Sequence, residues 1–335
     1  MTSPEPTGLS IIVPVRNAAQ TLAQCLEAIC SQSTRDDEVI LVDDHSDDDT
    51  AEVAARFPVK VIRMPSHRGV AAARNRGAAD ASKPVLFFLD ADVVLAQGAL
   101  SRARDDISDP AFDAIVGSYD DAPPSGSTVS TFKNLAHHFF HQRSAGEISS
   151  FWGACGLVRR QAFMAAGGFD EKRFIAPSIE DVELGYRLSD AGARIRVDPD
   201  LRVTHLKRWT ITSLLVTDIT RRAIPWSILS LERGRLPAEL NFATEQRVAA
   251  VIAIALLACA PLLLFRPEAV VVFVGLVAAA VWINRKLFAL LYAKGGARLL
   301  LVGFGLQQLY YLYSLGSLLA GVTLFTWRRL SSKST

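Results

Sequence analysis

The sequence predicts an α/β protein in which a doubly wound sheet is followed by an apolar helical region. Apolar runs that suit buried strands alternate with stretches of helical periodicity over about the first ninety residues. Two of these runs end in acidic residues, and three long apolar segments follow residue 247. The chain has 335 residues, of which 50% are hydrophobic, so it has room for both regions.

The elements of the first region follow from the period of its apolar residues. Strands are expected at 9–15, 38–43, 59–63 and 84–90. Helices are expected at 18–32, 49–57 and 69–81. Alternation of this kind implies parallel strands, whose carboxyl ends share the edge of the sheet where ligands bind. We therefore expect Asp43, Asp44, Asp90 and Asp92, which follow the second and fourth strands, to face a crevice at that edge.

From residue 112 to 205 the pattern is more mixed. Pro123, Pro124 and Gly126 indicate a loop, and a helix is expected from Phe132 to Gln142. Apolar positions at 179, 182, 184 and 188 indicate a helix over 179–192, which Gly192 would end. Two short strands are expected at 194–198 and 201–205.

The C-terminal third reads as a membrane region, expected over 247–327. Its apolar runs cover 248–265, 268–284 and 299–326, lengths that suit a bilayer crossing. Basic residues after the second run favour a hairpin with both ends cytoplasmic. Arg328 and Arg329 conflict with a third crossing, so two spans are the alternative to three. A buried helical core is the other reading.

The flanking segments carry less information. Residues 211–246 mix apolar residues with arginines, which suits amphipathic helices at an anionic membrane surface or an ordinary solvated basic face. Residues 1–8 lack the features of a signal peptide and are expected to be a disordered lead-in. Residues 328–335 are expected to form a basic tail.

Charge and cysteine content exclude some classes of protein. The net charge of +2 gives no global field that would favour a nucleic-acid partner. The four cysteines show neither metal nor disulfide spacing, so we expect them to be reduced.

The segment Asp90-Ala91-Asp92 places carboxylates at the end of a buried strand. Two or three carboxylate oxygens suit Mg²⁺ or Mn²⁺, which also accepts oxygens from a substrate diphosphate. A metal held there would neutralise a leaving diphosphate. The motif alone is a weak signal, because acidic residues are common where loops begin.

Further motifs accompany this one. The sequence carries six segments in the order VPVRNAAQTL, LVDDHSDDDT, GVAAARNRGA, FFLDADVVL, GGFDE and IEDVELGYRLSDAG. Together they resemble the family 2 glycosyltransferases with the GT-A fold, and with the apolar tail a membrane-bound bacterial member. The resemblance implies a GT-A catalytic domain, a doubly wound mixed sheet, over residues 9–210. His45 stands where Gly is common and Arg16 where Tyr is common, but neither difference removes a catalytic group.

The resemblance implies a nucleotide site. Pro14 and Asn17 belong to the first loop, which lines the nucleotide. Asp43 and Asp44 occupy positions that bond the nucleobase and ribose. Arg74 would lie near the base or the phosphates, with a surface helix arginine as the alternative.

The resemblance also implies a diphosphate and metal site. Asp92 would hold the metal directly, and Asp90 would reach the ribose or the metal through water. His205 is a candidate third ligand, with a structural histidine as the alternative. Lys207 and Arg208 could clamp the diphosphate.

In the family that the sequence resembles, a carboxylate of the ED motif is the catalytic base. Here that residue is Asp181, with Glu180 as its neighbour. An inverting transfer needs one base that removes the acceptor proton as the anomeric carbon is attacked. The alternative is an acidic pair that the dipole favours at a helix N-terminus.

The acceptor side is less well defined. Trp152, Gly153 and Ala154 lie where the family shapes the acceptor site, and Trp209 resembles a tryptophan of processive relatives only loosely. Trp152 could stack on a sugar, or it could be a core tryptophan.

The function that the resemblance implies is an inverting, metal-dependent glycosyltransferase at the cytoplasmic face of the inner membrane. It would use Mn²⁺ or Mg²⁺ and a nucleotide sugar, expected to be a UDP-sugar. The acceptor would be polyprenyl phosphate, a lipid-linked saccharide or a lipid head group, and a homo-oligomer is one option. The alternative is a membrane-anchored binding or scaffold protein without turnover, which would be expected to lack the acidic motifs.

Overall fold

The computed structural model describes residues 8–124, 126–234 and 244–331. The chain divides into two compact units. The α/β unit comprises Met1–Pro124 and His141–Lys207, and the helical unit comprises Ser125–Phe140 and Arg208–Thr335. The expectations for residues 1–7, 235–243 and 332–335 lie outside the described residues.

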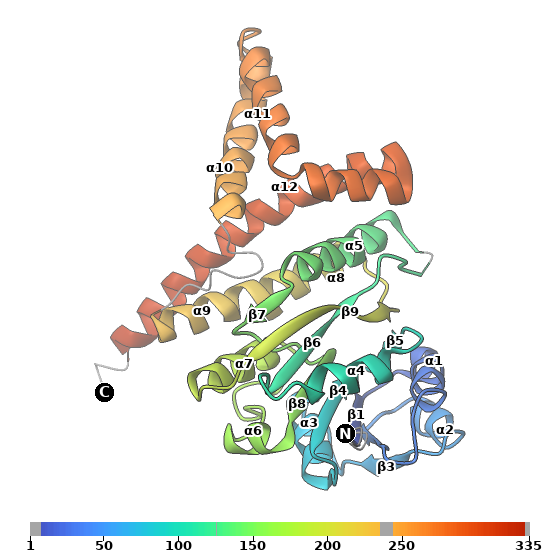
Figure 1. Ribbon diagram of the computed structural model, residues 1–335. Coiled ribbons are helices and arrows are strands. Elements are labelled where there is room, and N and C mark those ends of the chain that lie inside the picture. The colour runs from blue at the N-terminus through green and yellow to red at the C-terminus, as the bar shows by residue number, and fades with distance from the viewer. Residues whose placement is uncertain (1–7, 125, 235–243, 332–335) are drawn as a thin grey trace. The chain divides into compact units, whose positions relative to one another are not determined.

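The α/β unit is built on one mixed sheet, as predicted (Figure 1). Its strands are β1 Leu9–Val15, β2 Glu38–Asp43, β3 Lys60–Arg63, β4 Val85–Leu89, β5 Val93–Leu95, β6 Ala114–Tyr119, β7 Gly146–Ile148, β8 Cys155–Arg159 and β9 Ile195–His205. They lie in the order β3-β2-β1-β4-β8-β6-β9-β5, and β7 pairs with β9. The first four strands along this order run parallel, and β8 is antiparallel to both β4 and β6.

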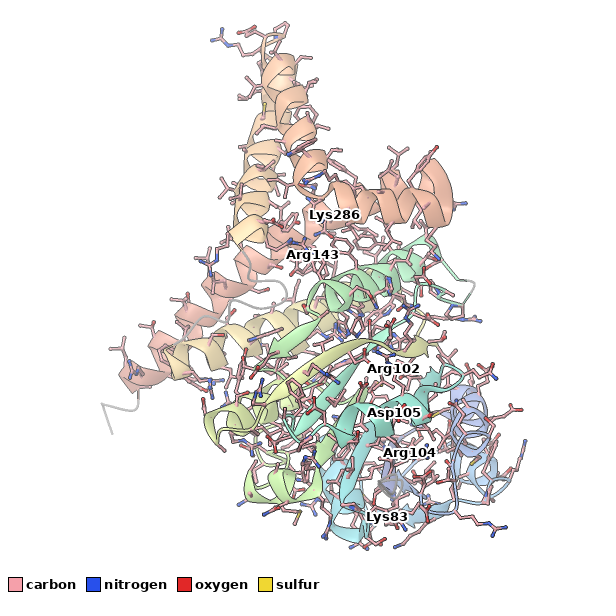
Figure 2. The ribbon with its side chains drawn as sticks, in the orientation of Figure 1. Lys83, Arg102, Arg104, Asp105, Arg143 and Lys286 are labelled. Atoms are coloured by element: carbon pink, nitrogen blue, oxygen red, sulfur yellow. The ribbon has the colours of Figure 1, made fainter. Side chains whose placement is uncertain are left out.

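Helices connect the strands of this sheet. They are α1 Ala19–Cys30, α2 Thr50–Ala54, α3 Val70–Asp80, α4 Ala99–Ser108, α6 Arg160–Ala165 and α7 Glu180–Asp190. Figure 2 labels Arg102 and Arg104 of α4. Arg102 pairs with Asp198 of β9, and Arg104 pairs with Asp37 ahead of β2, so α4 is tied to two separate strands.

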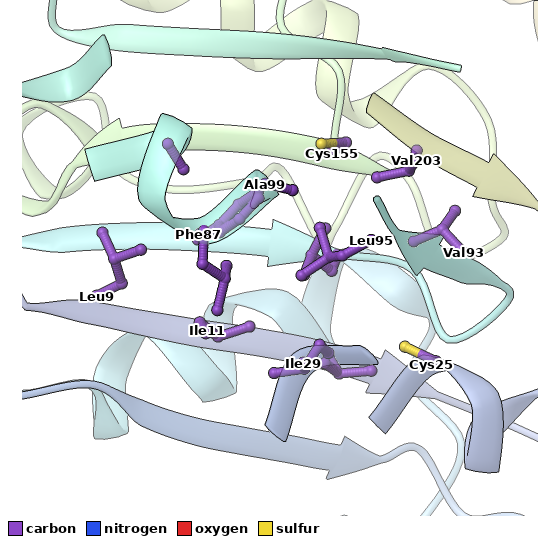
Figure 3. Packing of buried hydrophobic residues seen from close by; sticks show 14 of the residues in the cluster. Leu9, Ile11, Cys25, Ile29, Phe87, Val93, Leu95, Ala99, Cys155 and Val203 are labelled. Atoms are coloured by element: carbon purple, nitrogen blue, oxygen red, sulfur yellow. The ribbon is translucent and has the colours of Figure 1, made fainter. Parts of the chain in front are cut away.

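The two faces of the sheet are both buried, which explains why the central strands are continuous apolar runs. Leu9, Ile11 and Val13 of β1 belong to one apolar cluster, whereas Ile12 belongs to another. Figure 3 shows part of the first cluster, in which Leu9, Ile11 and Phe87 lie with Cys155 and Val203.

One strand differs from the sequence-based expectation. The segments 194–198 and 201–205 form a single strand, β9. Its register against β6 shifts between Val116 and Ser118, where Val116 pairs with Val197 and Ser118 with Arg202. This irregularity accommodates Pro199 within the strand, because a bulge leaves residues outside the ladder.

The helical unit contains the first part of α5, which as a whole spans Thr128–Arg143. Its other helices are α8 Ile211–Val216, η1 Thr217–Ala223, α9 Ile224–Arg233, α10 Thr244–Cys259, η3 Ala260–Leu264, α11 Ala269–Ile283 and α12 Arg285–Ser331. Non-helical dihedrals at Gly295 and Gly296 divide α12 into two helices. Asp218 of η1 joins two other helices of this unit. Its Oδ2 accepts from Lys133 Nζ of α5 at 2.6 Å and from Tyr313 Oη of α12 at 2.5 Å.

Two described helices are long and apolar enough to cross a membrane, namely Glu245–Leu264 and Arg285–Ser331. The second predicted run forms α11, which has only 15 residues and is about 22 Å long, less than a bilayer core. It ends at Ile283, Asn284 is its C-terminal cap, and a separate helix begins at Arg285.

Candidate active site

The loops that follow β1, β2, β3 and β4 leave the sheet at its carboxyl edge, because these four strands are parallel. Paired acidic residues stand at this edge after β2 and β4, as predicted. The loops also carry Asn17 and His67. The α/β unit thus gathers polar segments that are far apart in the sequence along one edge, where open α/β sheets bind ligands.

The first loop is tied to the second by its polar groups. Asn17 has a left-handed φ of 52°. Its N–H donates to Ser46 Oγ at 3.0 Å, and its Oδ1 accepts from the N–H of Asp47 at 2.8 Å.

Pro14 is buried in β1, and the pairing of β1 with β4 ends two residues earlier, at Ile12. The lost N–H of Pro14 therefore falls where the ladder to β4 has ended.

The paired aspartates after β2 are buried and already bonded. Asp43 Oδ1 accepts from the N–H of Ser46 at 2.8 Å. Asp44 accepts from the N–H groups of Arg68 and Gly69, both at 2.7 Å, and lies 2.7 Å from His67 Nδ1. These carboxylates organise the two loops, and their contacts with the nucleobase and ribose stay a prediction.

His45 adopts a backbone conformation that favours glycine. Its φ is 62°, in the left-handed region that glycine adopts without a steric cost.

Arg74 lies at the centre of the site. Its guanidinium donates to Asp90 Oδ1 at 2.7 Å and to Glu180 Oε1 at 2.9 Å, and its side chain is 4% exposed. Burial alone would lower the pKa of Arg74, but the carboxylates of Asp90, Glu180 and Asp181 raise it. Arg74 therefore joins the strand-end aspartates to the ED motif and is not a surface arginine, while its position near the base or the phosphates stays a prediction.

Asn75, the residue after Arg74, is hydrogen-bonded to the GGFDE segment. Asn75 Nδ2 donates to the carbonyl of Phe169 at 2.9 Å, and Asn75 Oδ1 accepts from the N–H of Phe169 at 2.9 Å. The Arg74 guanidinium lies 5.3 Å from the centre of the Phe169 ring. The ARN segment thus places three other motifs at once, which sequence order alone does not reveal.

Asp181 stands in the first turn of α7. Its Oδ2 accepts from the N–H of Gly153 at 3.0 Å. Enclosure by the protein and the neighbouring Glu180 carboxylate raise the pKa of Asp181 to about 6, against the opposing charge of Arg74. A carboxylate with a pKa in this range is suited to accept a proton near neutral pH.

Gly153 connects Asp181 to Arg74. A Cβ at this position would lie 2.7 Å from Arg74 Cζ, so the backbone approaches the guanidinium as only glycine allows. The carbonyl of the next residue, Ala154, accepts from the N–H of Asp90 at 3.4 Å. The predicted acceptor-side segment therefore touches both the strand-end aspartates and the base.

Asp92 and His205 form the other side of the site. Asp92 Oδ2 and His205 Nε2 are 3.5 Å apart. Burial would raise the pKa of Asp92, but His205 and the charge of Lys207 hold it below its usual range. An oxygen and an imidazole nitrogen at this separation fit a divalent cation whose remaining ligands are water and diphosphate oxygens.

Asp90, which was expected to reach the ribose or the metal through water, has a partner within the protein. Asp90 Oδ1 is engaged by Arg74, and no group of three or more His, Cys, Asp or Glu side chains suited to a metal occurs among the described residues. Arg74 competes for the Asp90 carboxylate, which leaves Asp92 and His205 as the pair that fits a metal. The surrounding charges still favour a cation. Asp90, Asp92, Glu180 and Asp181 are four carboxylates, and Arg74, Lys207 and the imidazole of His205 lie against them.

An aromatic cluster joins the metal side to the acceptor side. Tyr119 stacks on His205 with ring centres 4.7 Å apart and meets Trp152 edge-on at 4.6 Å. His141 meets Trp152 at 4.3 Å. Sequence reasoning identified neither Tyr119 nor His141, because only the fold brings residues 119, 141, 152 and 205 together.

Two predicted residues lie in the helical unit. Arg208 begins the second part of this unit and is exposed. Trp209 is 2% exposed, and its ring packs against Lys133 and His137. Because its ring is enclosed by α5 residues, Trp209 serves as a core residue of the helical unit rather than as an acceptor contact.

The mixed sheet with acidic groups at its carboxyl edge defines the class of protein. The fold is similar to that of the mannosyltransferase PcManGT from Pyrobaculum calidifontis in complex with GDP-Man and Mn²⁺. The TM-score is 0.56 at 19% identity, over 93% of this chain and 86% of that chain. The α/β unit therefore has the GT-A fold.

The sequence comparison gives the family. Residues 10–167 match the model of Glycosyl transferase family 2, and the chain belongs to this family. It is 31% identical over 213 residues to the pre-mycofactocin glycosyltransferase of Mycobacterium tuberculosis, over 60% of this chain and 43% of that protein. It is 34% identical over 128 residues to the glycosyltransferase AglE of Haloferax volcanii, over 36% and 42%. The chain thus spans less than half the length of these relatives.

Proposed function

We propose that the protein transfers a sugar from a nucleotide sugar to a membrane-associated acceptor, with inversion at the anomeric carbon. The observation that supports this most strongly is the link from Asp90 through Arg74 to Glu180, beside Asp181. This link lies within the α/β unit. It connects the strand-end aspartates, which are suited to a metal and a diphosphate, to Asp181, which is suited to act as the base.

The residues of the site have separate tasks in this mechanism. Asp92 and His205 would hold Mn²⁺ or Mg²⁺, which when bound supplies a Lewis acid for the leaving diphosphate. Lys207 adds positive charge on the same side. Asp181 accepts the proton of the acceptor as the acceptor oxygen bonds to the anomeric carbon and the bond to the diphosphate oxygen breaks.

Neighbouring groups hold the two carboxylates of the ED motif in place by hydrogen bonds. The N–H of Gly153 holds Asp181 Oδ2, while Glu180 is held by Arg74 and by the N–H of Ser178 at 2.8 Å. Both oxygens of Asp181 accept from backbone N–H groups, Oδ2 from Gly153 and Oδ1 from Val182 at 2.8 Å. Glu180 is paired with the Arg74 guanidinium, whereas the pKa of Asp181 is raised, so we assign the base to Asp181. A protein that had lost turnover would not be expected to keep this arrangement.

The donor and acceptor classes rest on different observations. PcManGT is described with GDP-Man, and this chain shares its fold. A nucleotide sugar is therefore the proposed donor. That the nucleotide is UDP stays a prediction. Two described helices suited to a membrane favour an acceptor in or near the bilayer, such as polyprenyl phosphate, a lipid-linked saccharide or a lipid head group.

The test uses the full chain in detergent, with a panel of nucleotide sugars and Mn²⁺. We expect one nucleotide class to raise the melting temperature, because a ligand that binds the folded state stabilises it. Transfer of labelled sugar to a membrane lipid extract should cease in EDTA and return with Mn²⁺ or Mg²⁺. Full transfer in EDTA would overturn the metal assignment, and the absence of stabilisation by every nucleotide sugar would overturn the donor assignment.

A further inference from the structure

The acceptor positions of the Asp44 carboxylate are used by hydrogen bonds within the protein. Its side chain is 4% exposed. One oxygen accepts from the N–H of Arg68, and the other accepts from the N–H of Gly69 and lies 2.7 Å from His67 Nδ1. A carboxylate with three short contacts and almost no exposure presents little to a ligand. Asp44 is therefore better suited to shape the loop than to bind the nucleoside directly.

His67 is the exposed member of this group. Its side chain is 41% exposed, although its Nδ1 is held by the buried carboxylate. The imidazole Nε2 can form a hydrogen bond of its own while Nδ1 is held. The contact with Asp44 thus fixes the orientation of the ring and leaves Nε2 as the nitrogen that Asp44 does not engage.

The position of His67 suits the nucleoside end of a donor. It lies in the loop between β3 and α3, at the carboxyl edge of the sheet. The aspartates after β4 mark the diphosphate end. β2 is two strands away from β4, at a spacing of about 4.8 Å per strand, so the Asp44 loop is about 10 Å distant. A nucleoside attached to a diphosphate covers a span of this size.

We infer that His67 contacts the nucleoside of the donor, with Nε2 hydrogen-bonded to the base or to a ribose hydroxyl. Asp44 acts as the positioning residue that holds the ring. This inference rests on the proposed function and deepens it, since it identifies the group that reads the nucleoside. It also accounts for an exposed imidazole beside a buried carboxylate at this edge.

The test compares two variants of His67 in the full chain. His67→Asn keeps an N–H near the position of Nδ1, so it can still donate to Asp44, but it lacks Nε2. His67→Ala loses both groups. The control is Arg76→Ala, which removes an exposed side chain of α3 that pairs with Asp80 on the same helix.

Calorimetry with Mn²⁺ would measure binding of UDP, GDP and inorganic pyrophosphate. For the nucleoside diphosphate that the wild type binds more tightly, we expect both His67 variants to show a dissociation constant about tenfold higher, as loss of one hydrogen bond predicts. Pyrophosphate binding and the melting temperature of His67→Asn should match the wild type, as should every property of Arg76→Ala.

The outcomes separate the two proposals. Wild-type affinity in His67→Asn would overturn the inference, because it would show that only the bond to Asp44 matters. Equal loss of pyrophosphate affinity would also overturn it, since the effect would not belong to the nucleoside. Failure of the wild type to bind either nucleoside diphosphate would instead overturn the proposed function.

Discussion

At the residue scale, the site is organised by one buried guanidinium group, that of Arg74. Arg74 bonds Asp90 and Glu180, which are separated by ninety positions in the sequence. Removing one partner of a buried ion pair leaves an uncompensated charge and is strongly destabilising. Arg74 thus makes the geometry of the strand-end aspartates depend on the position of α7.

The pKa of Asp181 gives a prediction on pH. Since this pKa is raised to about 6, Asp181 is protonated at lower pH and cannot accept the acceptor proton. We expect kcat/KM to rise with pH through about 6 and to level off above it. The measurement is a pH profile of transfer, with donor binding followed in parallel as the control. A rate that stays constant from pH 5 to 8 would contradict the role of Asp181.

The residue scale also shows where sequence reasoning ends. The motifs place Asp92, Asp181 and the first-loop residues at the carboxyl edge, because strand ends and helix starts can be read locally. The partners of Arg74 could not be read in this way, since the pairs span 16 and 106 positions. Trp209 was misplaced for the same reason, because its contacts are made with α5, more than seventy residues earlier.

At the element scale, α7 is held close to the segment ahead of β8. A Cβ on Gly185 would lie 2.1 Å from the backbone nitrogen of Phe151. The neighbouring backbone cannot swing aside as a side-chain end could. Glycine at this point therefore sets the distance between the ED helix and the Trp152 segment.

We expect Gly185→Ala to lower both stability and activity. Overpacking of this kind costs about 1–3 kcal/mol, although alanine favours a helix more than glycine. A displaced α7 should reduce kcat by about a hundredfold, because catalysis is sensitive to errors of about 1 Å. The checks are thermal melting and steady-state rates.

The matched control for that variant is Gly275→Ala in α11, where an added Cβ would meet open space. This change should leave both stability and rate near those of the wild type. Equal behaviour of the two variants would show that close packing of α7 does not matter.

The elements themselves could be predicted in part. β1 and β2 match the expected bounds, because their apolar runs end in clear turn residues. The antiparallel insertion of β8 between β4 and β6 was not foreseen, because pairing order depends on contacts distant in sequence. The joining of 194–198 and 201–205 into β9 was also missed, since Pro199 reads locally as a break.

At the scale of the whole molecule, the chain combines a GT-A unit with a helical unit that exposes many apolar side chains. Val251 is 65% exposed, Leu257 61% and Val271 77%. Exposed apolar surface of this extent in successive helices is typical of contact with lipid. The match to family 2 stops at residue 167, so the helical unit has to be interpreted by its own physics.

We expect the full chain to remain in the membrane pellet after extraction with alkaline carbonate. A helix that spans the bilayer is held by its buried apolar area, whereas a protein held by surface charge is released. Fractionation of the expressed chain measures this directly. Quantitative release into the supernatant would show that the apolar helices do not span lipid.

The central claim is that one bound nucleotide sugar is acted on by the metal pair Asp92 and His205 and by the base Asp181. Transfer and donor binding measured side by side for Asp181→Asn test it most directly. We predict donor affinity within about threefold of the wild type and a loss of transfer of about 10²–10⁴-fold, as expected for removal of a general base. Undiminished turnover in Asp181→Asn would contradict the account.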